Sequence, residues 1–130
     1  MAKKWMPRRS NKRFKTSRRH VPGKMNGLET KFSEYLKDLE RKGEVLWWAF
    51  EPARLKLADP DQKTTYTPDF WVHLKDGSMV FYETKGFWKP NARTKTKTAA
   101  SKYYMFPFIG VKWKNKKWEF EEFLPKKEDK

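Results

Sequence analysis

Residues 66–86 read YTPDFWVHLKDGSMVFYETKG and contain two strand-like runs on either side of a turn signal. The runs are rich in β-branched and aromatic residues bounded by turn formers, which is typical of strands. Asp76-Gly77 between them favours a β-hairpin. We therefore predict strands over about residues 66–74 and 79–85, joined as the two arms of one hairpin.

The length of the hairpin loop decides which side chains face each other, because alternate residues of a strand lie on one face. With a two-residue loop, Asp69 and Glu83 would point to opposite faces. With the three-residue loop Lys75-Asp76-Gly77, Asp69 falls opposite Glu83. Glycine in the third loop position suits a type I turn with a G1 bulge, so we predict the longer loop. The buriable face of the hairpin would then be formed by Phe70, Val72, Leu74, Val80 and Tyr82.

In that register two carboxylates and an amine share one face. Asp69 and Glu83 would be cross-strand neighbours, about 5 Å apart at Cβ, and Lys85 lies one pleat further along. Carboxylates this close repel each other unless a proton or a cation lies between them. Two carboxylates can hold a hard divalent cation, and a neighbouring lysine can orient a water beside it. An ordinary ladder of surface charges is the alternative interpretation.

The composition limits the remaining possibilities. A chain of 130 residues forms one domain with tails, and its 22 aromatic residues favour a folded core. It has no cysteine, which excludes a disulfide framework and a Cys-based zinc site and fits a cytoplasmic protein. No apolar run is long enough for a membrane span. No glycine-rich phosphate loop is present, so we expect no nucleotide cofactor.

The net charge of +15 is concentrated at the N-terminus, where residues 1–24 hold ten basic and no acidic residues. Such a block often contacts nucleic acid, and we interpret it as a flexible nucleic-acid-binding arm. A solvated tail that only aids solubility is the alternative. Residues 25–124 would form a single folded domain and residues 125–130 a polar tail. The arm's candidate phosphate-binding residues are Lys3, Lys4, Arg8, Arg9, Lys12, Arg13, Arg18 and Arg19.

The other elements follow from hydrophobic periodicity and turn residues. The expected helices cover residues 28–42 and 92–104, and the further strands cover residues 45–50, 54–57, 106–113 and 118–124. This order predicts an α/β fold, in which a mixed central sheet has one helix before it and a crossover helix within it.

The hairpin motif, PD at residues 68–69 and ETK at residues 83–85, resembles that of the PD-(D/E)XK nucleases. The element order resembles their restriction-endonuclease-like core of a helix, three strands, a helix and a strand, with a further C-terminal strand. Within that superfamily, YTPDF at residues 66–70 with ETKG at residues 83–86 is similar to small phage-encoded nuclease-like proteins, to archaeal-type Holliday junction resolvases and to endonuclease subunits of some transposases. The resemblance covers about residues 28–111.

The resemblance implies a DNA endonuclease that hydrolyses phosphodiester bonds with Mg²⁺, for which Mn²⁺ would substitute. Asp69 and Glu83 would be metal ligands, together with the backbone carbonyl of Thr84. Lys85 would position or polarise the attacking water. Branched or junction DNA is a plausible substrate by the same resemblance, small members often act as homodimers, and a phage-encoded member would act in the host cytoplasm.

Members often add an acidic residue from the first helix, and Glu29 is the match here. Glu29 precedes Leu36 by seven residues, so on a helix the two side chains lie about 20° apart around the axis. Glu29 therefore borders the apolar stripe of this helix, which is formed by Leu28, Phe32, Tyr35, Leu36 and Leu39. The alternative is that an acid in the first turn favours the helix dipole. Glu51, after the first strand, is the reserve candidate. On or before the second helix, Lys89, Arg93, Lys95 and Lys97 would face DNA phosphates or, alternatively, only solvent.

Two other functions fit parts of the sequence. A non-catalytic nucleic-acid-binding protein on the same scaffold would use residues 1–24 without cleaving DNA. A small structural component of a phage or ribosomal assembly would also suit the basic segment. The nuclease is favoured because Asp69, Glu83 and Lys85 are all present.

Overall fold

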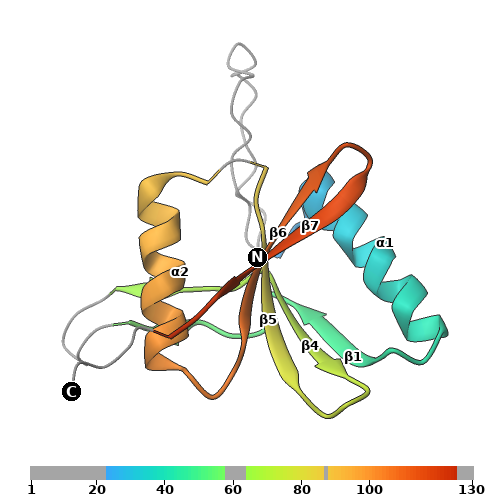
Figure 1. Ribbon diagram of the computed structural model, residues 1–130, viewed down its shortest axis with the longest axis horizontal. Coiled ribbons are helices and arrows are strands. Elements are labelled where there is room, and N and C mark those ends of the chain that lie inside the picture. The colour runs from blue at the N-terminus through green and yellow to red at the C-terminus, as the bar shows by residue number, and fades with distance from the viewer. Residues whose placement is uncertain (1–22, 58–63, 87, 126–130) are drawn as a thin grey trace, which may run out of the picture.

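The computed structural model describes residues 23–57, 64–86 and 88–125, which form a mixed α/β fold (Figure 1). In chain order the elements are α1 (Gly27–Arg41), β1 (Val45–Phe50), β2 (Leu55–Lys56), β3 (Thr65–Tyr66), β4 (Phe70–Leu74), β5 (Met79–Thr84), α2 (Pro90–Lys102), β6 (Phe108–Lys114) and β7 (Lys117–Phe123). The expected helix-first mixed sheet is therefore confirmed, and α2 begins two residues early because Pro90 suits the first helical position.

Five of the strands form one sheet in the order β1-β4-β5-β6-β7. The β5–β6 pair is parallel, and the other three pairs are antiparallel. A parallel pair needs a crossover connection, and α2 supplies it between β5 and β6. The short strands β2 and β3 form a separate antiparallel ribbon.

The hairpin β4–β5 has the three-residue loop predicted from its glycine. Phe70 pairs with Tyr82, a register that places Leu74 opposite Ser78. The Gly77 N–H donates to the Leu74 carbonyl at 2.9 Å, and Gly77 has a φ of +96°. Glycine adopts this left-handed backbone without the cost that a Cβ would impose. Asp69 and Glu83 therefore approach each other as expected.

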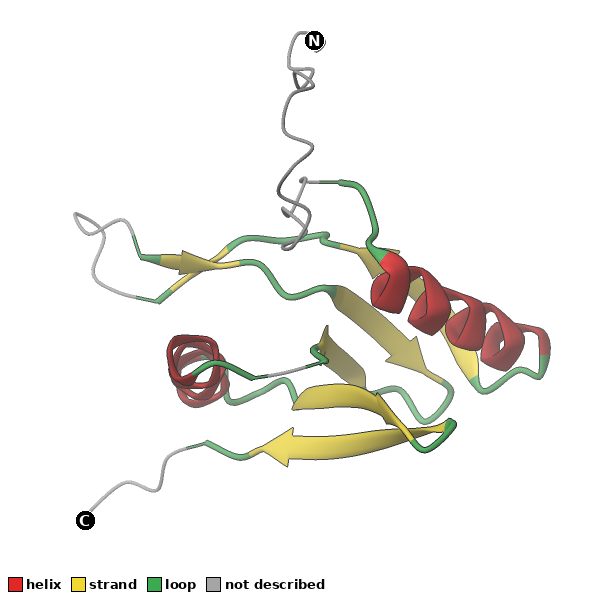
Figure 2. Ribbon diagram, turned by 90° about the horizontal axis from the view of Figure 1, so that it is seen from above, coloured by secondary structure: helices red, strands yellow, loops and turns green. Residues whose placement is uncertain are grey.

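Both faces of the sheet are covered, and each helix packs on its own side (Figures 1 and 2). On the α1 side, Phe32 and Leu36 pack against Phe70 and Val72. The α2 side has a second cluster of buried residues, made of Tyr66, Phe81, Ala99, Ala100, Phe108 and Phe123. Alternation along β4 and β5 supplies both clusters, because neighbouring residues point to opposite faces.

Helix α1 is capped at both ends by residues adjacent to it in the chain. Asn26 caps it, and the Glu29 side chain returns a hydrogen bond to the Asn26 N–H at 2.9 Å, which completes a capping box. At the other end Gly43 has a φ of +82°, and its N–H donates to the Glu40 carbonyl at 3.1 Å. Both ends of the helix are thus satisfied locally.

The prediction of one strand over residues 66–74 is wrong, because the chain breaks into β3 and β4. Pro68 lies in the break and has no N–H to donate to a sheet. The Asp69 N–H donates to a side-chain oxygen of Glu83 at 3.2 Å instead of to a neighbouring strand. As a result Tyr66 belongs to the β2–β3 ribbon and approaches β5 from outside the main sheet.

Candidate active site

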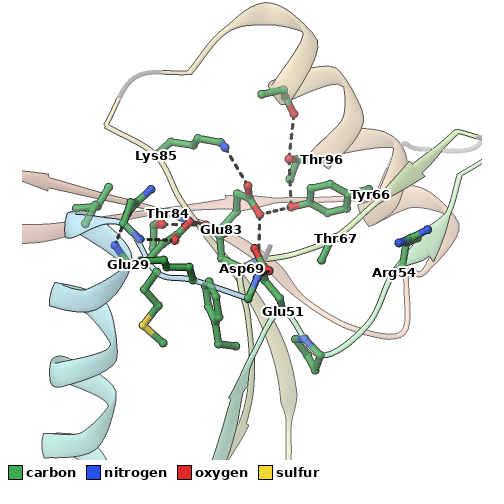
Figure 3. Close-up of a pocket in the computed structure, with 18 of the residues that line it drawn as sticks. Glu29, Glu51, Arg54, Tyr66, Thr67, Asp69, Glu83, Thr84, Lys85 and Thr96 are labelled. Atoms are coloured by element: carbon green, nitrogen blue, oxygen red, sulfur yellow. Dashed lines mark hydrogen bonds and ion pairs between the residues drawn. The ribbon is translucent and has the colours of Figure 1, made fainter. Parts of the chain in front are cut away.

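Asp69 of the PD pair and the three ETK residues line a cleft of about 1450 Å³. Its walls come from the start of α1, the segment after β1, strand β3, the end of β5 and the first turns of α2. Figure 3 shows Glu29, Glu51, Asp69 and Glu83 around this cleft, with Lys85 extending from the end of β5. Carboxylates from three separate parts of the fold therefore share one opening.

Asp69 is buried, with 5% of its surface exposed, and its carboxylate is held by Thr84. Oδ2 accepts the Thr84 backbone N–H at 2.9 Å and the Thr84 hydroxyl at 2.8 Å. Both bonds end on the same oxygen, so Oδ1 takes no part in them. The Glu51 N–H also donates to the Asp69 backbone carbonyl at 2.7 Å. The aspartate is thus fixed in position through both its backbone and its side chain.

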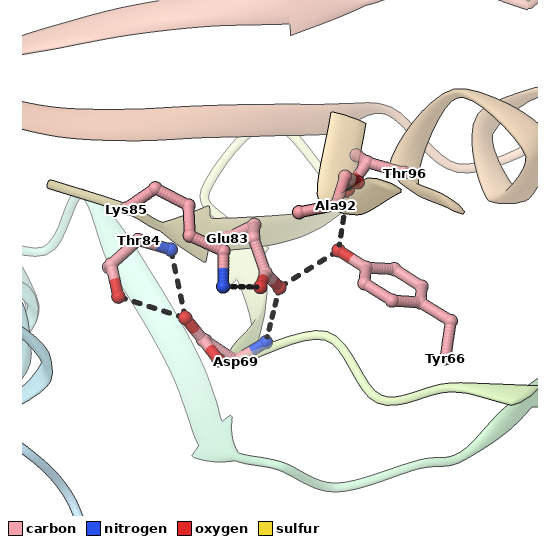
Figure 4. Close-up of polar contacts among 7 residues, drawn as sticks. All are labelled: Tyr66, Asp69, Glu83, Thr84, Lys85, Ala92 and Thr96. Carbon is pink, nitrogen blue, oxygen red and sulfur yellow. Dashed lines mark hydrogen bonds and ion pairs between the residues drawn. The ribbon is translucent and has the colours of Figure 1, made fainter. Parts of the chain in front are cut away.

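Glu83 is equally buried, with 6% of its surface exposed. Its Oε1 accepts the Asp69 N–H at 3.2 Å and the Tyr66 hydroxyl at 2.8 Å (Figure 4). Its Oε2 lies 3.1 Å from Nζ of Lys85, whose side chain is one-third exposed. The three residues predicted from the sequence are therefore in direct contact, and Tyr66 joins them.

Burial raises the pKa of Asp69 well above its ordinary value, and the negative charges of Glu83 and then Glu29 raise it further. The two Thr84 hydrogen bonds oppose this rise. Burial also raises the pKa of Glu83, although the charge of Lys85 and the Tyr66 hydrogen bond lower it. Two buried carboxylates that ionise with difficulty are a feature of sites that bind cations or protons.

The same charges act on the groups around the pair. Burial lowers the pKa of Lys85, but the combined attraction of Glu83, Asp69 and Glu29 exceeds this effect and raises it overall. Burial, followed by the negative charge of Glu83, raises the pKa of the Tyr66 hydroxyl well above its ordinary value. Near neutral pH Lys85 is therefore a cation, and Tyr66 is a hydrogen-bond donor.

Both acids considered as the additional group line the cleft. Glu29 is buried and close enough to act electrostatically on Asp69 and Lys85. It also closes the capping box of α1, which gives it a local structural role at the start of the helix. Glu51 has a φ of +48°, a left-handed conformation that is rare for residues other than glycine, and its Oε1 accepts the Gly23 N–H at 2.9 Å.

The donor set fits a small hard cation better than a transition metal, because every candidate ligand atom is an oxygen. Mg²⁺ needs only one or two carboxylates, since water and substrate phosphate complete its shell. Asp69 and Glu83 meet this requirement, and Oδ1 of Asp69 lies outside the Thr84 contacts. Within residues 23–57, 64–86 and 88–125, no three His, Cys, Asp or Glu side chains are grouped closely enough to hold a metal ion by themselves.

Of the basic residues expected to face DNA on α2, Lys95 lines the cleft. Lys89 and Lys97 are exposed. Arg93 instead forms a bidentate pair with Glu121 at 3.1 and 2.6 Å. The eight candidates in the N-terminal arm lie outside the residues that the structure describes. The cleft is also lined by two basic residues that were not among the predicted phosphate contacts, Lys24 and Arg54.

Trp88 caps the core on the α2 side. Its ring lies 5.3 Å from the ring of Phe123, and the Arg93 guanidinium lies 5.6 Å from its centroid. A Cβ on Gly110 would come within 2.9 Å of the Trp88 ring, so the close contact requires glycine there.

Two polar residues of the site escaped the sequence analysis. The sequence pattern assigns Tyr66 to a long strand and Thr96 to a helix, and it gives neither residue a role in the site. In the structure both are buried beside Glu83. A weak signal existed for Thr96, since a polar residue that shares a helix face with Ala99 and Ala100 would be buried with them. No local signal marked Tyr66, whose partner is 17 residues away.

Comparisons of this chain with protein-family models, with curated protein sequences and with solved structures found no match. In the part of the chain that the structure describes, neither helix is long and apolar enough to cross a membrane. What the site does is therefore inferred from its own residues.

Proposed function

We propose that this protein is a divalent-metal-dependent DNA endonuclease of the PD-(D/E)XK type. The observation that carries the proposal is the contact between the two arms of the hairpin. The Asp69 N–H donates to Glu83 while Lys85 lies 3.1 Å from the same carboxylate, all within one cleft. Two buried carboxylates beside an ammonium group serve no evident packing purpose, and they suit the binding of a cation and a phosphate.

The topology supports the same family. Helix α1 precedes the antiparallel strands β1, β4 and β5, and α2 crosses over to β6, which pairs parallel to β5. This order is the one expected for a restriction-endonuclease-like core, and it therefore supports the proposal. The β2–β3 ribbon is an insertion between the first two of these strands. It contributes Tyr66 to the site.

The proposed reaction is hydrolysis of a phosphodiester. Asp69, Glu83 and the Thr84 carbonyl would hold Mg²⁺, and Glu29 would add negative charge from α1. When bound, Mg²⁺ would supply positive charge to the scissile phosphate and make a water molecule more acidic. The water oxygen would form a bond to phosphorus as the bond to one bridging sugar oxygen breaks. The water gives up one proton, and the leaving sugar oxygen takes up one proton, so the reaction has no net change in protons.

Within this reaction Lys85 has a role that its own position supports. Its ammonium group lies at the mouth of the cleft, one-third exposed and paired with Glu83. A compact cation with three N–H donors can orient the attacking water and stabilise the negative charge that develops on the phosphate oxygens. Lys24, Arg54 and Lys95 around the same cleft would contact neighbouring phosphates, which fix position but not sequence.

The proposal is tested with supercoiled plasmid and a four-way DNA junction, each incubated with Mg²⁺ or with EDTA. Asp69→Asn and Lys85→Ala should lower the cleavage rate by more than about 100-fold, since loss of a residue that only supports a metal ligand already costs about 10–100-fold. Asp38→Asn and Lys37→Ala, exposed residues on α1, are matched controls that should cleave normally. DNA binding without cleavage by the unaltered protein would favour the non-catalytic alternative.

A further inference from the structure

Tyr66 reaches the candidate site from an element that is not part of the main sheet. It lies in β3, which pairs only with β2 in the short ribbon. Its ring packs in the cluster on the α2 side, and 8% of its surface is exposed. The hydroxyl at the end of this ring donates to Oε1 of Glu83 at 2.8 Å (Figure 4). A residue from the ribbon therefore contacts a carboxylate of β5 directly.

Both oxygens of the Glu83 carboxylate are restrained by contacts with neighbouring groups. Oε1 accepts the Tyr66 hydroxyl and the Asp69 N–H, while Oε2 faces the ammonium group of Lys85. Of the two bonds to Oε1, the one from Tyr66 is shorter, at 2.8 Å against 3.2 Å. Rotation of the carboxylate about its last bond would move Oε1 away from both donors. The orientation of Oε2 toward the cleft thus depends on Oε1 being held.

The tyrosine hydroxyl has support from α2 as well. Oγ1 of Thr96 lies 3.5 Å from the Tyr66 oxygen and 3.0 Å from the Ala92 carbonyl, and Thr96 is fully buried. Oε1 of Glu83, at 2.8 Å, is nearer to the Tyr66 hydroxyl than Oγ1 of Thr96 is, so the hydroxyl proton is directed to Glu83. A chain of contacts therefore runs from α2 through Tyr66 to the carboxylate.

We propose that Tyr66 is a positioning residue, whose hydroxyl holds the Glu83 carboxylate in the orientation that binds the divalent cation. This inference rests on the proposed function, because it assigns a metal to Glu83. Groups that hydrogen-bond to metal ligands set the geometry of those ligands, and their loss weakens metal binding without abolishing it. The apolar ring of Tyr66 contributes to the core separately, through its place in the buried cluster.

The two contributions are separated by Tyr66→Phe, which keeps the ring and removes only the hydroxyl. Tyr103→Phe is the matched control, because the Tyr103 hydroxyl donates a similar bond, at 2.9 Å, to the backbone carbonyl of Lys56. Both tyrosines pack in the same cluster, and both contact the β2–β3 ribbon. Only the Tyr66 hydroxyl contacts a proposed metal ligand.

Mn²⁺ affinity of the full-length protein is measured by isothermal titration calorimetry for the unaltered chain and both variants. Tyr66→Phe should weaken Mn²⁺ binding by about 10–100-fold, and Tyr103→Phe should leave it within a factor of about two. In the plasmid assay the Mg²⁺ concentration for half-maximal cleavage should rise by the same factor in Tyr66→Phe. The rate at saturating Mg²⁺ should largely recover.

Equal Mn²⁺ affinity in Tyr66→Phe and the unaltered protein would overturn the positioning role while leaving the nuclease proposal intact. A similar loss in Tyr103→Phe would also overturn it, because the effect would then be a general loosening of the ribbon. If the unaltered protein neither binds Mn²⁺ nor cleaves DNA, the proposed function fails and this inference fails with it.

A measurement on the unaltered chain covers the case in which Tyr66→Phe does not fold. Addition of Mg²⁺ should shift the NMR signals of the Tyr66 ring, because its hydroxyl bonds to the carboxylate that receives the ion. The signals of Tyr103 should stay in place, since its hydroxyl partner is the carbonyl of Lys56. An unmoved Tyr66 in a protein that binds Mg²⁺ would contradict the proposal.

Discussion

Thr84 donates two hydrogen bonds to a single oxygen of Asp69, from its backbone N–H at 2.9 Å and from its hydroxyl at 2.8 Å. The two residues are neighbours across the hairpin, and both are buried. Threonine at the central position of ETK thus orients the aspartate of PD. This contact links the two halves of the motif independently of any bound ion.

Thr84→Val should destabilise the protein, because it removes the hydroxyl bond and keeps the side-chain volume. A hydrogen bond contributes about 0.5–1.5 kcal/mol between neutral groups and about 1.5–3 kcal/mol when one group is charged, so a loss of about 0.5–3 kcal/mol is expected in the free energy of unfolding. Urea denaturation at pH 8 measures it. Thr98→Val, on the exposed face of α2, is the control and should stay within about 0.5 kcal/mol of the unaltered protein. Equal stabilities of the two variants would show that the hydroxyl bond contributes nothing.

Asp69→Asn should stabilise the protein in EDTA near neutral pH. Burial, together with the charges of Glu83 and Glu29, raises the pKa of Asp69 well above 3.8, so the folded state binds this proton more tightly than the unfolded chain does. Stability of the unaltered protein should therefore fall as pH increases from about 4 through the raised pKa, whereas asparagine does not ionise.

The advantage of Asp69→Asn should grow with pH over that window in EDTA and shrink when Mg²⁺ is added. Unfolding free energies from pH 4 to 9 test this. Asp38→Asn should show no gain, because hydrogen bonding to Lys42 lowers the pKa of Asp38. An Asp69→Asn advantage that does not vary with pH would contradict the expected sign.

Gly110→Ala should destabilise the fold by about 1–3 kcal/mol, the typical cost of overfilling a packed core. The added Cβ would lie 2.9 Å from Cζ2 of Trp88 and 3.0 Å from Cε2 of Phe123. Thermal or urea unfolding measures the loss. Gly86→Ala is the control, since no atom lies within 4 Å of the position that its methyl group would take, and it should change stability by less than about 0.5 kcal/mol.

Gly77→Ala should cost about 1–2 kcal/mol, because the residue has a φ of +96° and a Cβ is unfavourable in that region. Space is not the cause, since nothing lies within 4 Å of the added methyl group. Gly27→Ala, in the first turn of α1, also adds a methyl group into open space, but at an ordinary φ, and should be neutral or slightly stabilising. A similar effect of both substitutions on urea unfolding would show that the hairpin loop does not depend on glycine.

Arg54→Ala combined with Lys95→Ala should weaken DNA binding at low salt. It should also reduce the slope of log affinity against log salt by about 1 for each phosphate that the protein no longer neutralises. Both side chains line the cleft. Lys37→Ala with Arg41→Ala removes the same charge from α1, where these residues pair with Glu34 and Asp38. If both double variants bind DNA equally weakly, net charge rather than the cleft governs binding.

Local patterns determined the elements of this fold and the register of its central hairpin. The length of the loop decides which positions of the two strands face each other. Gly77 favours the three-residue loop because it adopts the left-handed backbone that the last loop position requires. The apposition of Asp69 and Glu83 was therefore predictable from residues close together in the chain. The limits of α1 were predictable for the same reason, because capping by Asn26 and termination at Gly43 act over one turn.

Contacts between distant segments were decided only by the tertiary structure. Tyr66 and Thr96 are separated by 30 residues and meet beside Glu83 because the ribbon and α2 pack on the same side of the sheet. Arg54 and Lys95 reach one cleft for a similar reason. Side-chain periodicity reports which face of an element is buried, but it carries no information about which other element covers that face. The two facing carboxylates were thus encoded locally, whereas the groups that hold and surround them depend on how the layers pack.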